Sequence, residues 1–223
     1  MHAPPAIASP TIDPLGESAL LVTLGDRVDR GIVARVHGAV MALRAARLPG
    51  VEEIVPAYAS LAVYFDRSRT TRAALENAVA EIVGEMAYAS PLLAPGRSLE
   101  IPTRYDGADL DDIARVTGLD VAEVIARHSE RTYVVYALGF APGFAYLGDL
   151  DPALVVPRRA TPRTHVPAGS VAIAGAQTAV YPFATPGGWH LVGTTMLVMF
   201  DARRSPAALL AVGDEVRFVP VPS

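Results

Sequence analysis

The sequence predicts an α+β protein built from two domains, and three observations carry this prediction. Short apolar runs and segments of helical periodicity alternate in the first part of the chain. A stretch with two Pro and one Gly, SPLLAPGR, follows at 90–97. Beyond residue 139 the helical period disappears, and Gly and Pro separate short apolar runs. We therefore expect an N-terminal α+β domain at 1–89, a linker at 90–97 and a β-rich domain at 98–223.

The N-terminal domain is expected to contain strands and amphipathic helices in the order β-β-α-β-β-α. Residues 30–46 carry apolar side chains at helical spacing, and Pro49 and Gly50 follow as stop signals. Residues 60–65 alternate in the manner of a half-buried strand. The other expected elements are strands at 19–24 and 51–57 and a last helix that is capped by Thr70 or Thr71 and extends to Met86. This order predicts a sandwich with helices on one face of a sheet.

The second domain is expected to be mostly β-structure with long shaped loops. Between 139 and 195 the chain has eight Gly and seven Pro, which is typical of a barrel or sandwich. The expected strands are 99–105, 132–138, 196–200 and 215–221, and the expected short helices are 109–116, 121–128 and 205–210.

Composition excludes several classes of chemistry. Apolar residues make up 51% of the chain and charged residues 19%, enough to build a core. The net charge of −4 gives no bulk attraction to nucleic acid or to an anionic membrane. Cys is absent and all 19 basic residues are Arg, so thiolate sites and the lysine of a P-loop are excluded.

Several motifs and targeting signals are also absent from the sequence. It has no HExxH, GxSxG or strand-following GxGxxG motif, so we expect no metal site of its own and no self-sufficient hydrolase. Without a signal-peptide pattern or an apolar run of about 20 residues, a cytoplasmic location is expected.

Four Gly- and Pro-rich segments in the second domain are the candidates for function. They read GFAPGFAYL (139–147), PRRATPR (157–163), VPAGSVAIAGAQ (166–177) and YPFATPGGWHLVGTT (181–195). Gly permits positive φ and close approach of the backbone to a ligand, and Pro fixes φ. Long ordered loops on a β scaffold often bind ligands, although tight barrel corners alone explain the same pattern.

Within these segments the charged and rare residues indicate an anionic ligand. Residues 139–195 carry a net charge of +1 in an otherwise acidic chain, and Arg158 and Arg163 offer forks suited to a carboxylate or phosphate. We expect Arg159 to be solvated. His190 is the one plausible acid–base group of its loop, because His165 is expected in a polar turn and His128 at a surface or helix end. Trp189 either stacks on a ligand or packs in the core, and Gln177 either binds substrate or caps a turn.

The same four segments resemble the KipI-like family, also known as allophanate hydrolase subunit 1. Members include the B subunit of bacterial 5-oxoprolinase, and the family is similar to part of the carboxyltransferase domain of urea carboxylase. The upstream IPTRYDGADLDDIA (101–114) resembles the family as well. Two positions depart from its pattern: the family often has Arg where Thr194 stands and Val where Thr103 stands. If that Arg contacts an anion, this chain lacks the contact.

The resemblance implies a fold, a function and partners. The fold is a small ferredoxin-like α+β domain followed by a cyclophilin-like β-barrel. The function is that of one component of an ATP-dependent 5-oxoprolinase, inactive alone, which converts 5-oxo-L-proline to L-glutamate with a KipA-like partner (the C subunit) and a LamB-like partner (the A subunit). ATP, with Mg²⁺, is used in the complex. We expect His190 as the candidate catalytic group, and the residues expected at the substrate or anion site are Phe140, Pro142, Gly143, Tyr146, Arg158, Arg163, Gln177, Tyr181, Gly187, Gly188, Trp189, Thr194 and Thr195.

Two alternatives remain open from the sequence. A KipI-type protein inhibits a sensor histidine kinase by binding it and needs no chemistry. A component of urea or allophanate carboxylation would need biotin from a partner, because this chain has no Lys to carry it.

Overall fold

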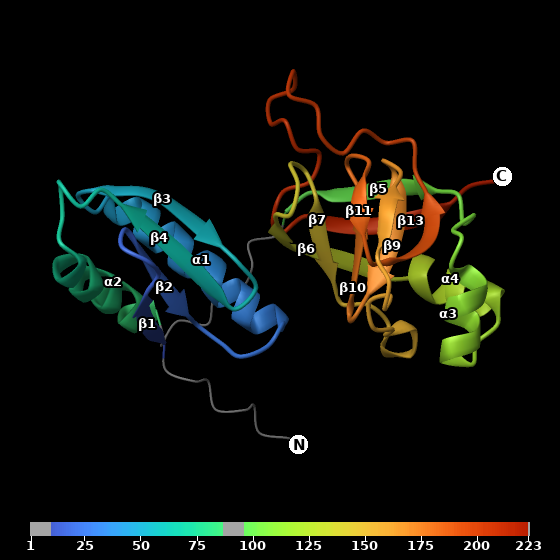
Figure 1. The fold of residues 1–223 in the computed structure, drawn as a ribbon, viewed down its shortest axis with the longest axis horizontal. Coiled ribbons are helices and arrows are strands. Elements are labelled where there is room, and N and C mark those ends of the chain that lie inside the picture. Colours follow the sequence, from blue (N-terminus) through green and yellow to red (C-terminus); the bar gives the residue numbers. More distant parts are fainter. Residues whose placement is uncertain (1–9, 87–95, 223) are drawn as a thin grey trace. The chain divides into compact units, whose positions relative to one another are not determined.

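The computed structural model describes residues 10–86 and 96–222. The chain divides into two compact units, 1–94 and 95–223, which are described separately below. Figure 1 shows helices and strands mixed in the first unit and strands predominating in the second. Most of the predicted linker at 90–97 lies outside the described residues.

The first unit is a four-stranded antiparallel sheet packed with two helices in the predicted order β-β-α-β-β-α, and its first strand lies outside the ranges that were predicted. The sheet order is β1-β2-β4-β3, and the helices pack on each other while sharing one core with the sheet. Leu61, Val63 and Phe65 alternate into that core, as the pattern of β4 requires. The elements are β1 (Thr11–Pro14), β2 (Ala19–Thr23), α1 (Arg30–Ala46), β3 (Val51–Pro56), β4 (Ser60–Phe65) and α2 (Arg72–Met86).

Helix α1 begins and ends at well-defined caps. The Asp29 carboxylate accepts hydrogen bonds from the backbone N–H groups of Gly31 (2.9 Å) and Ile32 (3.2 Å), as an N-cap does. The helix ends at Arg47, which has a left-handed backbone (φ 46°, ψ 48°). That conformation costs a residue with a Cβ about 1–2 kcal/mol, and glycine is the usual occupant.

The second unit is a seven-stranded sheet that closes on itself. The order is β12-β9-β10-β7-β6-β13-β5. Its two edges meet at a bridge in which Arg104 and Thr194 exchange backbone hydrogen bonds of 2.9 and 2.8 Å. The strands are β5 (Ser98–Thr103), β6 (Thr132–Leu138), β7 (Ala145–Gly148), β9 (Ser170–Ala174), β10 (Gln177–Val180), β12 (His190–Thr194) and β13 (Glu215–Pro220).

The barrel has a filled interior and short covering elements. Val171, Ile173 and Val180 point into the interior with residues of the other strands. The covering elements are α3 (Leu110–Thr117), α4 (Val121–Ser129), the 3-10 turn η1 (Pro152–Leu154) and a two-stranded ribbon of β8 (Arg163–Val166) and β11 (Thr185–Gly187).

Two predicted elements of the second unit are wrong. Residues 205–210 form bends and an isolated bridge at Ala208 instead of a helix, because Arg204 donates side-chain hydrogen bonds to the carbonyls of Val198 (2.8 Å) and Ala207 (3.3 Å) and so holds an irregular path. Residues 196–200 are not a strand: Met196 is 97% exposed and the segment makes one isolated bridge, at Phe200. High β-propensity forms a strand only where a neighbouring strand is available.

Two histidines also differ from expectation. His165 lies within β8 instead of a turn, and its side chain is exposed. His128 is at a helix end, as predicted, but is completely buried in the barrel.

Candidate functional site

A cluster of aromatic side chains lies on the outer face of the barrel, where the Gly-rich segments converge. Strand alternation puts Ala172 and Ala174 of β9 on the face opposite to the interior residues, and they pack against this cluster. Phe144 is at its centre, with its ring centroid 5.4 Å from that of Tyr181 and 5.8 Å from that of Trp189. The interpretation that Trp189 packs against other side chains is confirmed, since the residue is 5% exposed.

Glycine allows the cluster to close. A Cβ on Gly187 would collide with the hydroxyl and ring of Tyr181, so only Gly fits beside that ring. Burial raises the pKa of Tyr181, and a backbone hydrogen bond from Trp189 and the charges of Arg158 and Arg163 partly offset this. Tyr181 is therefore a neutral hydrogen-bonding group at neutral pH.

Arg158 is the cation that the cluster presents to solvent. Its guanidinium carbon lies 6.0 Å from the centroid of the Trp189 ring, at the outer range of a cation–π contact. Burial raises the pKa of Tyr146, and the charge of Arg158 partly offsets that rise. Within the described part of the chain no carboxylate lies within 4.0 Å of Arg158, so its hydrogen-bond donors are available to an anion.

Arg163 and Arg159, in contrast, bind a carboxylate of the protein itself. Both terminal nitrogens of Arg163 donate to Asp109 at 2.8 Å, and Arg159 donates to the same carboxylate at 2.6 Å. The backbone N–H of Leu191 adds a fourth hydrogen bond at 2.7 Å. The expectation that Arg159 is solvated is wrong. Ligand binding by Arg163 stays a prediction, and its side chain already has an anionic partner in Asp109.

Asp109 is the residue that sequence reasoning missed. Its side chain is almost fully buried. Burial acts to raise its pKa, but the hydrogen bonds from Arg163 and Leu191 and the positive charges outweigh that effect and lower the pKa below the usual value. An Asp before a helix suggests an N-cap, yet this carboxylate makes no capping bond to α3. It instead fastens the 157–163 loop to β12.

His190 alternates away from the aromatic cluster. Its neighbours Trp189 and Leu191 belong to the cluster, whereas its Nε2 donates to the carbonyl of Pro157 at 3.0 Å. That bond assigns the lone pair to Nδ1, which is shielded from solvent and has no hydrogen-bond partner among the described residues. Acid–base chemistry at His190 would use this nitrogen and stays a prediction.

The other predicted site residues are spread over three places. Phe140 is 63% exposed and has φ 67°, and its ring centroid lies 5.3 Å from that of Phe144. The same loop contains Pro142, which is exposed, and Gly143, whose backbone packs against Phe200. Gln177 begins β10, and Gly188 lies beside Pro162. Thr194 bonds to Asp106 at 3.0 Å at the barrel seam, followed by buried Thr195, so these two belong to the seam and not to the aromatic cluster.

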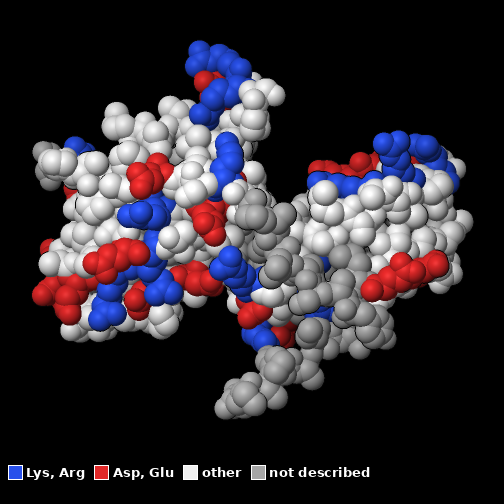
Figure 2. All heavy atoms as spheres, turned by 180° about the vertical axis from the view of Figure 1, so that it is seen from behind, with Lys and Arg blue, Asp and Glu red and all other residues white. Residues whose placement is uncertain are grey.

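The surface carries both charges side by side. Figure 2 shows basic and acidic residues interspersed over the barrel unit. Among the described residues, no group of three or more His, Cys, Asp and Glu is arranged to hold a metal ion. In the same part of the chain no helix combines the length and apolar character needed to cross a membrane.

Taken together, the described residues form a β-barrel unit and a separate α+β unit. The barrel unit carries Arg158 on its outer cluster of aromatic side chains, which we call the aromatic shelf. The family model for the carboxyltransferase domain, subdomain C and D, matches residues 10–210. The chain therefore belongs to the carboxyltransferase subdomain C and D family.

Relatives of known name cover nearly the whole chain. It is 38% identical over 219 residues to the 5-oxoprolinase B subunit of Bacillus subtilis, covering 93% of this chain and 91% of that protein. It is 41% identical to the 5-oxoprolinase B subunit of Escherichia coli O157:H7, covering 92% and 94%.

Solved structures have the same fold. TTHA0988 is 38% identical with a TM-score of 0.79; the match covers 92% of this chain but only 40% of that longer chain. PH0987 from Pyrococcus horikoshii is 39% identical with a TM-score of 0.55, covering 95% and 97%. Kluyveromyces lactis urea carboxylase, at 22% identity and a TM-score of 0.81 over 96% of this chain and 22% of that one, supports the fold alone.

Proposed function

We propose that this chain is the B subunit of an ATP-dependent 5-oxoprolinase, which opens the lactam of 5-oxo-L-proline to give L-glutamate. The observation that carries the proposal is the identity of 38% and 41% to two proteins of that name over more than nine tenths of each chain. Because that name denotes one component of a larger enzyme, it supports a requirement for partners. KipA-like and LamB-like subunits are the partners proposed here.

The chemistry needs anion stabilisation more than a nucleophile. Hydrolysis of an unstrained amide is slow, and transfer of the ATP γ-phosphoryl group to the lactam oxygen makes the ring carbon a better electrophile. Water then adds at that carbon, the ring C–N bond breaks, and phosphate leaves with ADP as the other product. The substrate carboxylate and the phosphoryl group are both anions that fixed cationic donors stabilise. Arg158, which lies on the aromatic shelf and has no carboxylate partner among the described residues, is the proposed donor in this chain.

The first test is glutamate formation from 5-oxoproline and ATP, measured for this chain alone and mixed with KipA-like and LamB-like subunits. We expect glutamate and ADP from the mixture and none from the single chain. Mixtures that leave out one component at a time are the control. A properly assembled mixture that forms no glutamate would contradict the proposal and would favour kinase binding or a carboxylation role.

A second prediction concerns Arg158. We expect Arg158→Ala to lower kcat/KM of the assembled enzyme about 100-fold or more, the usual effect of removing one donor that stabilises charge in the transition state, without loss of stability. Arg217→Ala removes an exposed arginine on β13; it is the matched control and should have no effect.

Arg163→Ala should lower both activity and stability, because it breaks the ion pair with Asp109. Unchanged kcat/KM in Arg158→Ala would remove this residue from the site.

A further inference from the structure

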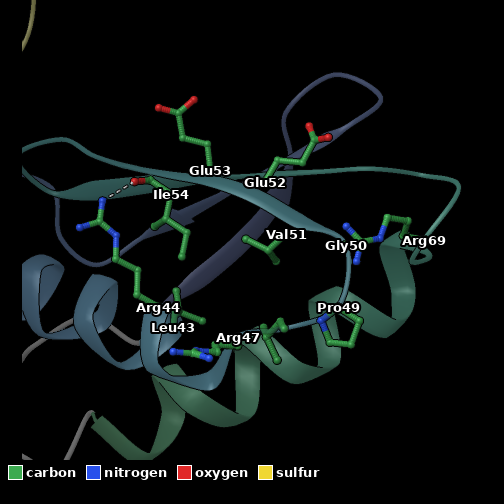
Figure 3. Close-up of a pocket in the computed structure, with 11 residues that line it drawn as sticks. Leu43, Arg44, Arg47, Pro49, Gly50, Val51, Glu52, Glu53, Ile54 and Arg69 are labelled. Atoms are coloured by element: carbon green, nitrogen blue, oxygen red, sulfur yellow. Dashed lines mark hydrogen bonds between the residues drawn. The ribbon is translucent and has the colours of Figure 1, made fainter.

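A hollow of about 470 Å³ lies in the first unit, between the end of α1 and strand β3. Leu43 and Val51 give it an apolar floor, and the turn that contains Pro49 and Gly50 forms one wall. Figure 3 shows the open space between these segments. Its volume is within the range of small-molecule sites, and no residue of the aromatic cluster takes part in it.

Three arginines surround the hollow: Arg44 and Arg47 from the end of α1, and Arg69 from the turn before α2. Glu52 and Glu53 belong to the same lining, but Figure 3 shows both carboxylates pointing away from the hollow, on the outer side of β3. The rim facing the hollow is therefore cationic.

These arginines lack the internal partners that most others have. Among the described residues, eleven of the 19 arginines have a carboxylate within 4.0 Å. In the same part of the chain, none of the three at the hollow does. Arg44 makes one bond, from Nη2 to the carbonyl of Ile54 at 3.2 Å. Among the residues that the structure describes, the side chains of Arg47 and Arg69 have no hydrogen-bond acceptor, so their donors can serve a ligand.

The backbone at Arg47 indicates that its side chain has a role. A left-handed residue at a helix end is most easily a glycine, and the same turn does use glycine at Gly50, where φ is 79° and a Cβ would lie 2.8 Å from Thr70. A residue with a Cβ is strained at position 47 (φ 46°). Strained residues concentrate at functional sites, and here the strained residue places a cation at the edge of the hollow.

We propose that this hollow binds a small organic anion. Its carboxylate or phosphate group pairs with Arg47 and Arg69, and its apolar body lies on Leu43 and Val51. A guanidinium fork suits both anionic groups. The proposal does not depend on 5-oxoprolinase activity, since the residues belong to the other unit.

The test is an NMR titration of the full chain, following the backbone amides of Leu48, Gly50 and Val51, since Pro49 between them has no N–H. The probes are L-glutamate and 5-oxo-L-proline as carboxylates and inorganic phosphate and ATP as phosphates, each up to about 10 mM, where even a millimolar site fills. We expect saturable shifts at these amides with one class of probe, and the class identifies the source of the anion. Shifts at the aromatic cluster report the barrel site separately.

Matched variants decide whether the arginines bind the probe. Arg47→Gly relieves the strained backbone, so its melting temperature should not fall, yet its Kd for the probe should rise about tenfold or more. Arg69→Gln should weaken binding similarly. Arg30→Gln, which removes the same charge at the other end of α1, should bind as the unaltered chain does. No saturable shift with any probe, or unchanged Kd in both Arg47→Gly and Arg69→Gln, would overturn the proposal.

Discussion

Replacing Asp109 by Ala is expected to destabilise the barrel by about 3 kcal/mol. The carboxylate accepts four hydrogen bonds, three of them from the guanidinium groups of Arg159 and Arg163. Breaking a buried pair by removing one partner costs roughly 3–5 kcal/mol. We expect the lower end, because about a quarter of each arginine side chain stays in water and screens the orphaned charge. Urea unfolding monitored by the fluorescence of Trp189 measures this, since the sole Trp is buried in the barrel.

A neighbouring acid provides the control for Asp109. Asp112→Ala removes an exposed pair with Arg115 on the same helix and should change the free energy of unfolding by less than about 0.5 kcal/mol. The lowered pKa of Asp109 means that its contribution is complete above its unfolded pKa near 4 and is lost as the pH falls through its folded value. A loss no larger in Asp109→Ala than in Asp112→Ala would show that the network is only a surface feature.

The stability of the barrel should fall as the pH decreases from about 6.5, because of His128. The imidazole accepts a hydrogen bond at Nδ1 from the Tyr105 hydroxyl (2.8 Å) and donates from Nε2 to Thr178 Oγ1 (2.9 Å), whose own proton goes to the Ala172 carbonyl (3.1 Å). Protonation at Nδ1 would lose the hydrogen bond from Tyr105 and would bury a positive charge. Burial accordingly lowers the pKa of His128 to about 3.

The sign and size follow from proton linkage. Between the unfolded pKa of about 6.5 and the folded value, the unfolded chain binds one proton more, so stability is lost on acidification at up to ~1.4 kcal/mol per pH unit. Unfolding free energies between pH 7.5 and pH 4.5, again from Trp189 fluorescence, measure the slope. His128→Phe removes the titrating group and should flatten the profile, whereas His165→Gln, at an exposed histidine, should keep it. A flat profile in the unaltered chain would mean that His128 is charged in the fold.

Local periodicity determined most of the elements. Residues 30–46 and 60–65 form α1 and β4 as predicted, because one apolar face and strict alternation each admit one regular structure. The segments 139–147 and 181–195 were singled out by their Gly and Pro content, but only the structure shows that they converge, with Gly187 leaving the space that Tyr181 fills. Two predictions failed. The strand expected at 196–200 has no neighbouring strand to pair with, and at the helix expected at 205–210 side-chain hydrogen bonds from Arg204 hold the chain in another path.

Only the tertiary structure decided which charged and polar groups are already satisfied. Arg158 and Arg163 are equivalent in the sequence, but a carboxylate some 50 residues away engages one and leaves the other on the aromatic shelf. His128 has the sequence pattern of a helix-end residue and proves to be a buried, neutral hydrogen-bonding group. Sequence patterns reflect neighbours along the chain, whereas the pairing of charges depends on groups that folding brings together from distant positions. The sequence by itself therefore determined the elements and the family resemblance, and the fold determined which arginines remain free to bind a ligand.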